Sequence, residues 1–117
     1  NIDNGKVVAT EGAYSFNLMK GGLLRPFNRE GWGTTVVIQS LNNLDSTVST
    51  VLVMTGNNTT ANLNTLWLVR RNGNLCIQLG GQTGQVTVTS NNGTITVKSN
   101  NSSNIEVFFM AVDGSNV

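Results

Sequence analysis

The sequence predicts an all-β fold, an antiparallel β-sandwich of about 8–9 short strands, and two observations support this. Nearly half of the 117 residues are Asn, Thr, Gly or Ser. Thr favours strands, whereas Asn and Gly favour the tight turns between them. Apolar residues recur in short stretches with a period of two, and no segment has the spacing of an amphipathic helix. Short strands joined by tight turns indicate a sandwich or a barrel, of which we expect the sandwich, and the length suits a single domain over residues 1–117.

Nine segments have strand character, and turn-forming residues separate them. They are residues 6–10, 13–19, 34–41, 47–55, 65–71, 74–79, 85–90, 94–99 and 105–112. In residues 13–19 apolar and polar side chains alternate, as in a half-buried strand. In residues 47–55 four apolar residues follow one another, which predicts burial on both faces. Residues 21–33 contain four Gly and the only Pro, and we expect them to form an irregular loop.

Two Asn-Gly pairs predict hairpins, at Asn72-Gly73 and Asn92-Gly93. Each pair stands between apolar stretches, and a type I′ turn requires positive φ at both of its central residues. The last strand, residues 105–112, is apolar on both faces. We therefore expect its second face to be covered by something other than the core of this sandwich.

The composition excludes most catalytic chemistry. The chain has no His, one Cys and only 11% charged residues, and its six carboxylates are scattered. It therefore lacks the His and Cys side chains of most nucleophilic and metal sites and has no phosphate-binding loop. Two carboxylates could still meet in space as a glycosidase pair, but solvated turn residues are the favoured interpretation, and we expect no enzyme activity and no cofactor. A net charge of +1 is too small for nucleic-acid binding, and no apolar stretch is long enough for membrane insertion. Cys76 is expected to be a small buried apolar residue.

The best candidate for ligand binding is the charged, aromatic segment from Arg25 to Trp32. Arg25 and Arg29 have guanidinium groups that suit a carboxylate, Asn28 adds an amide, and Trp32 adds a flat apolar face with one donor. Such a set fits an acidic sugar or a protein surface. The alternative is that Trp32 closes the end of the core while the arginines are solvated.

A second, weaker candidate is the pair Arg70 and Arg71 beside the first Asn-Gly turn. Adjacent strand residues point to opposite faces, so the two are not expected to form one clamp. The alternative is that both are solvated charges at the end of a turn. Trp67 alternates with other apolar residues and is expected in the core or at a subunit interface.

The chain resembles the head domains of adenovirus-type fibres, especially the short heads of the atadenoviruses of reptiles and ruminants. The resemblance lies in short, uncharged strands without disulfides, an opening Asn-Ile-Asp-Asn-Gly-Lys-Val-Val similar to a shaft repeat, and an apolar final strand. It implies a homotrimer on the virion surface, assembled inside the host cell. It also implies binding to a host receptor, either a protein or a glycan, sialylated glycans included. Residues 1–12 would then be the end of a shaft, and the lack of an initiator Met suggests a fragment or a processed product.

Other functions fit the same composition. A carbohydrate-binding module or lectin predicts an exposed aromatic platform at Trp32, and a phage tail-fibre tip has the same strand-rich, weakly charged character. A structural or adhesin module predicts no small ligand at all. These alternatives differ in oligomeric state and in glycan binding.

Overall fold

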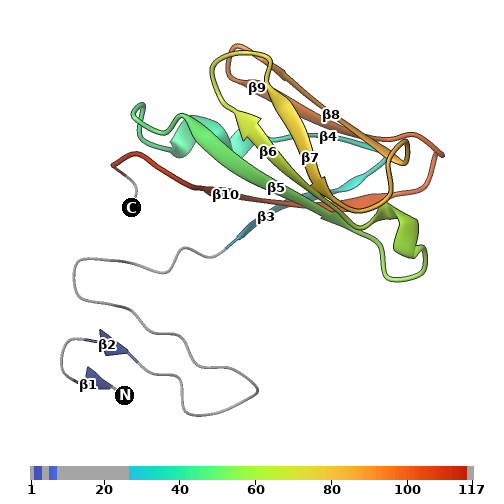
Figure 1. Ribbon diagram of the computed structural model, residues 1–117, viewed down its shortest axis with the longest axis horizontal. Coiled ribbons are helices and arrows are strands. Elements are labelled where there is room, and N and C mark those ends of the chain that lie inside the picture. Colours follow the sequence, from blue (N-terminus) through green and yellow to red (C-terminus); the bar gives the residue numbers. More distant parts are fainter. Residues whose placement is uncertain (1, 4–5, 8–26, 116–117) are drawn as a thin grey trace.

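The computed structural model describes residues 2–3, 6–7 and 27–115, and all of its sheets are antiparallel, as predicted. The first pair of strands, β1 (Ile2–Asp3) and β2 (Lys6–Val7), forms a small ladder of its own. The other eight strands form a five-stranded and a three-stranded sheet (Figure 1). The predicted strand at residues 13–19 lies outside the described residues, as does most of that at 6–10.

The five-stranded sheet has the order β3-β10-β5-β6-β7, and the three-stranded sheet has the order β4-β9-β8. The first consists of β3 (Asn28–Gly33), β10 (Ile105–Ala111), β5 (Thr50–Gly56), β6 (Thr65–Arg70) and β7 (Cys76–Gly80). The second consists of β4 (Thr35–Val37), β9 (Thr94–Ser99) and β8 (Val86–Asn91). Two 3₁₀ turns, η1 (Gln39–Asn43) and η2 (Ala61–Leu63), complete the fold.

One apolar core lies between the two sheets, because alternate side chains of each strand point inward. Its fully buried members come from both sheets and from the two 3₁₀ turns. The largest are Phe109, Leu41, Leu63, Ile95, Ile105, Val48, Val51, Val53, Val69, Val97 and Val107. The chain passes from one sheet to the other between β3 and β4, so a short connection closes this side of the sandwich.

Trp67 lies in this core, one of the two places predicted for it, and its indole N–H has a hydrogen-bond partner there. Its indole Nε1 donates to the Thr65 hydroxyl at 2.9 Å, which is 2.5 Å from the Thr55 hydroxyl. Thr55 in turn donates to the Leu63 carbonyl at 2.7 Å. A chain of hydrogen bonds therefore joins β6, β5 and η2 where unpaired polar groups would be costly.

The hairpin at Asn92-Gly93 has the predicted form. Asn92 has φ 46° and Gly93 has φ 100°, and the two join β8 to β9 with Asn91 opposite Thr94. Two central residues with positive φ are what a type I′ turn requires.

The hairpin at Asn72-Gly73 exists, but its turn is not the predicted two-residue type. Five residues separate β6 from β7, and Asn72 has a negative φ. The cause lies in the tertiary structure, because backbone groups of this loop form hydrogen bonds with other segments of the chain. The Arg71 amide donates to the Ser49 carbonyl at 2.8 Å, and the Arg71 carbonyl accepts from the Gly93 amide at 2.8 Å.

The prediction of an irregular loop over residues 21–33 is wrong for residues 28–33, which form the edge strand β3. Its sequence, Asn-Arg-Glu-Gly-Trp-Gly, consists mostly of polar residues and glycines and lacks the apolar alternation that predicts a strand. The strand is interrupted by a bulge, because Glu30 has no partner across the ladder on β10. The Glu30 carboxylate instead accepts from the amides of Gln39 (2.6 Å) and Ser40 (3.3 Å). These amides begin η1, so the strand predicted over residues 34–41 ends at Val37.

Two predictions about burial need correction. Cys76 is only partly buried and packs at the margin of the core, where desolvation raises the pKa of its thiol. The strand β5 is buried on one face only, because Leu52 and Met54 alternate with fully buried Val51 and Val53 and are themselves half-exposed.

Asp113 joins the chain after β10 to the beginning of β5. Its Oδ1 accepts from the amides of Ser49 and Thr50, both at 2.9 Å, and the Ser49 hydroxyl donates to Oδ2. These bonds favour the ionised carboxylate. The hydrogen bond from the Ser49 side chain contributes most, and together they lower the pKa of Asp113 from its usual 3.8 to about 2.

We expect Asp113 to make the stability of the domain sensitive to acid. Because its pKa is lower in the folded state, its contribution is present above pH 3.8 and is lost as the pH falls towards about 2. Asp113→Asn should lower the free energy of unfolding by about 1 kcal/mol at neutral pH, since water screens part of the interaction. Urea denaturation at pH 7, 4 and 2 measures both effects. The variant should lose less stability than wild type between pH 4 and 2, with Ser49→Ala in between; equal losses in all three would contradict this role.

Candidate functional site

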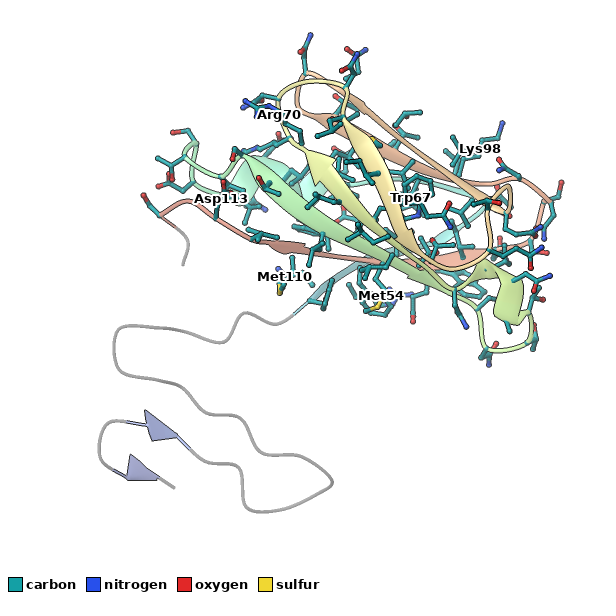
Figure 2. All side chains as sticks on the ribbon, in the orientation of Figure 1. Met54, Trp67, Arg70, Lys98, Met110 and Asp113 are labelled. Carbon is teal, nitrogen blue, oxygen red and sulfur yellow. The ribbon has the colours of Figure 1, made fainter. Side chains whose placement is uncertain are left out.

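The outer face of the five-stranded sheet is covered by large apolar side chains. Two rows cross the strands: Met110, Leu52, Leu68 and Ile77 are paired in register, and so are Phe108, Met54 and Leu66. Figure 2 shows Met54 and Met110 on the side of the sheet that faces away from β8 and β9. We call this surface the apolar face and define it by eight residues. They are Leu52, Met54, Leu66, Leu68, Ile77, Leu79, Phe108 and Met110.

No described residue covers the apolar face. Ile77 is 42% exposed and Leu79 is 53% exposed, and the other six members are half-buried because they lie beside one another. Contiguous apolar surface of this kind on a sheet marks an interaction site more often than a solvent-exposed face. The sequence indicated part of it, through the second apolar face of residues 105–112.

A cleft opens at one end of the apolar face, and we call it the Trp32 cleft. Its volume is about 470 Å³, and it is lined by Trp32, Gly56, Asn57, Asn58, Asn64 and Glu106. The ladder explains its position, since Trp32 pairs with Glu106, which pairs with Gly56. Gly56 has no side chain, so a gap is left between β10 and the loop after β5. A Cβ at Gly56 would lie 3.2 Å from the Asn64 side-chain oxygen and would narrow this gap.

Two of the polar residues in the cleft have structural roles. Asn57 accepts from the amides of Thr59 (2.8 Å) and Thr60 (3.0 Å) and donates to the Asn104 carbonyl at 2.7 Å. The side-chain oxygen of Asn64 accepts from the Asn57 amide at 3.1 Å. These bonds fix the loop between β5 and β6, so the wall of the cleft is built before any ligand arrives.

Other polar atoms in the cleft have no hydrogen-bond partner among the described residues. They are the indole Nε1 of Trp32, the side-chain amide of Asn58, the Nδ2 of Asn64 and the Oε1 of Glu106. The second carboxylate oxygen of Glu106 accepts from Arg29 Nε at 2.8 Å. The cleft therefore combines an exposed aromatic surface with donors and acceptors, while its one carboxylate is paired with a cation.

The structure separates the predicted site residues into two groups. Asn28, Arg29 and Trp32 are exposed on β3, and Arg29 and Trp32 both lie beside Glu106. Arg70 and Arg71 lie at the other end of the sheet, about 20 Å away along β5 at ~3.4 Å per residue. Arg25 is outside the described residues. The two groups therefore do not form one site.

Arg71 is held by the protein itself. Its guanidinium donates to the carbonyls of Asp45 (2.7 Å), Leu41 (2.9 Å) and Val48 (3.3 Å). Arg70 points elsewhere, as the alternation of strand residues predicted, and its Nε lies 3.4 Å from the Asn72 carbonyl. The contacts of Arg71 are those of a structural residue.

Glu106, Asn58 and Asn64 were missed from the sequence. Glu106 could have been found from the sequence, because it is the one charged residue in the last strand, which is otherwise apolar. The two asparagines carried no such signal, since Asn is abundant throughout.

No known protein family, curated protein or solved structure matches this chain. None of the helical turns in the described part of the chain is long and apolar enough to cross a membrane. Within residues 2–3, 6–7 and 27–115, no three His, Cys, Asp or Glu side chains lie close enough together to hold a metal ion.

Proposed function

We propose that this protein is the receptor-binding head of a trimeric viral fibre, located at the virion surface, that attaches the particle to a host cell. The observation that carries the proposal is the apolar face, which a second and a third copy of the chain would cover. The composition and strand pattern, which resemble those of adenovirus-type fibre heads, support it. The proposal includes no catalytic activity and no cofactor.

The charge distribution favours a copy of the same chain as the occupant of the apolar face. All eight residues that define the face are uncharged, so three copies arranged around a threefold axis can turn this face towards one another without burying an unpaired charge. The nearest charges, Arg29, Glu106 and Arg70, lie at the margins, and the first two already form an ion pair. An apolar centre with a polar rim is the usual anatomy of a stable interface.

We expect light scattering to give a mass three times that of the 12.5-kDa chain. The double variant Ile77→Glu/Leu79→Glu should be monomeric, because both side chains are exposed in the single chain and six charges would meet in the trimer. Thr89→Glu, which adds a charge to the exposed side of β8, is the matched control and should stay trimeric. Circular dichroism checks that each variant is folded.

A monomeric wild type would overturn the trimer. A trimer unaffected by the double substitution would place the interface elsewhere and reject the apolar face.

Attachment is tested separately with fluorescently labelled trimer on reptile and ruminant cell lines. Saturable binding that unlabelled trimer displaces is expected on at least one of them. A stable trimer that binds to none would reject the attachment function and leave the assembly intact.

A further inference from the structure

The Trp32 cleft has the features of a small-molecule site. Trp32 is 49% exposed although it lines a cavity, so a large aromatic surface is available to a ligand. The volume of about 470 Å³ falls within the range of ~300–1,000 Å³ that is usual for ligand pockets. Its walls belong to β3, β10 and the loop after β5, which the ladder and the Asn57 hydrogen bonds hold in place.

We infer that the Trp32 cleft binds an uncharged sugar ring, stacked on the indole of Trp32 and hydrogen-bonded by Asn58, Asn64 and Glu106. This inference names the ligand class for the attachment function proposed above and rests on it. The faces of an aromatic ring are electron-rich, and the C–H groups on one side of a sugar ring are weakly positive, so the two stack favourably. A flat, rigid ring on an edge strand presents this surface at a small cost in entropy.

The polar atoms around Trp32 match sugar hydroxyl groups. A hydroxyl both donates and accepts, and the cleft has atoms of both kinds without a partner among the described residues. Trp32 Nε1 and Asn64 Nδ2 donate, Glu106 Oε1 accepts, and the Asn58 amide does both. A few placed polar groups beside an aromatic wall fix the orientation of a ligand and select for it.

The charges argue for a neutral sugar and against an acidic one. Glu106 supplies the one carboxylate that lines the cleft, whereas Arg29 is not among the lining residues and donates its Nε to Glu106 at 2.8 Å. A carboxylated ligand would therefore face the Glu106 carboxylate at short range. The ion pair makes the cleft nearly neutral overall, and an uncharged ligand suits it without a desolvated, unpaired charge.

The test is a glycan array on which each neutral glycan is printed with and without a terminal sialic acid, probed with the wild-type protein. Binding to uncapped neutral glycans is expected, with no gain from sialylation.

The best neutral glycan is then titrated by calorimetry. Trp32→Ala should weaken binding at least tenfold, and Trp32→Phe should retain part of it because a stacking surface is kept. Leu75→Ala, which truncates an equally exposed apolar residue at the other end of the sheet, is the matched control and should bind as wild type does.

Three results would overturn the inference. Binding that requires sialic acid rejects the neutral ligand, and Trp32→Ala with unchanged affinity rejects the site. A protein that trimerises and attaches to cells but recognises no glycan rejects the sugar while the proposed function stands. The proposed function itself is tested by the mass and cell-binding measurements, which do not depend on the array.

Asn58→Ala is a further test of the site, since it should weaken glycan binding without any change in melting temperature.

Discussion

Arg71→Ala is expected to lower the free energy of unfolding by about 3 kcal/mol, because hydrogen bonds from a charged donor contribute ~1.5–3 kcal/mol each and do not add fully. The guanidinium of Arg71 joins three carbonyls that lie between residues 41 and 48. That segment connects η1 to β5 and carries the buried side chains Leu41 and Val48. The alanine variant removes the guanidinium from all three carbonyls, of which those of Leu41 and Asp45 keep one backbone donor each, and loosens the segment over one end of the core.

Arg70→Ala is the matched control for this prediction. Arg70 is exposed, and the single hydrogen bond of its side chain within the described residues, to the Asn72 carbonyl, is long at 3.4 Å. Its removal should cost less than about 0.5 kcal/mol, as for most surface substitutions. Equilibrium denaturation in urea compares the two variants directly. Equal losses would show that the carbonyl contacts of Arg71 do not stabilise the fold.

Gly81→Ala is expected to destabilise the domain by about 3 kcal/mol or more, through backbone strain and a steric clash together. Gly81 has φ 92°, a left-handed conformation that L-residues adopt only with strain. A Cβ there would also overlap the carbonyl oxygen of Asn64 and lie 2.9 Å from the Cα of Thr65. Because both are backbone atoms, the clash can be relieved only if the main chain moves.

Gly84→Ala separates the destabilisation caused by backbone strain from that caused by the steric clash of the added Cβ. Gly84 has a similar φ of 85°, but no atom lies within 4 Å of the position its Cβ would take. Alanine there should cost only about 1 kcal/mol, the strain alone. Thermal and urea denaturation of the two variants give the difference, and equal losses would mean that the close approach at Gly81 is relieved without cost. Since Asn64 also lines the Trp32 cleft, Gly81→Ala should weaken ligand binding as well.

The sequence determined those parts of the molecule in which neighbouring residues along the chain carry the information. Alternation of apolar and polar residues located β8, β9 and the core side of β10, because successive side chains of a strand point to opposite faces. The turn at Asn92-Gly93 followed from the backbone freedom of these two residues. The apolar face, which no described residue covers, was indicated in part by residues 105–112, where both faces of one strand are apolar.

The tertiary structure decided everything that depends on partners distant in the chain. Residues 28–33 became a strand because β10 offers them a ladder, and Asn72-Gly73 lost its two-residue turn because neighbouring segments bond to that loop. The Trp32 cleft joins Trp32 to Glu106 and to the loop after β5, and the Arg29–Glu106 pair spans 77 positions. Local propensity contributes little to such contacts, because their free energy is gained only once the two sheets have formed. For this reason the sequence predicted an all-β sandwich and a second apolar face on its last strand. Only the folded chain showed which strands share that face and where the Trp32 cleft lies beside it.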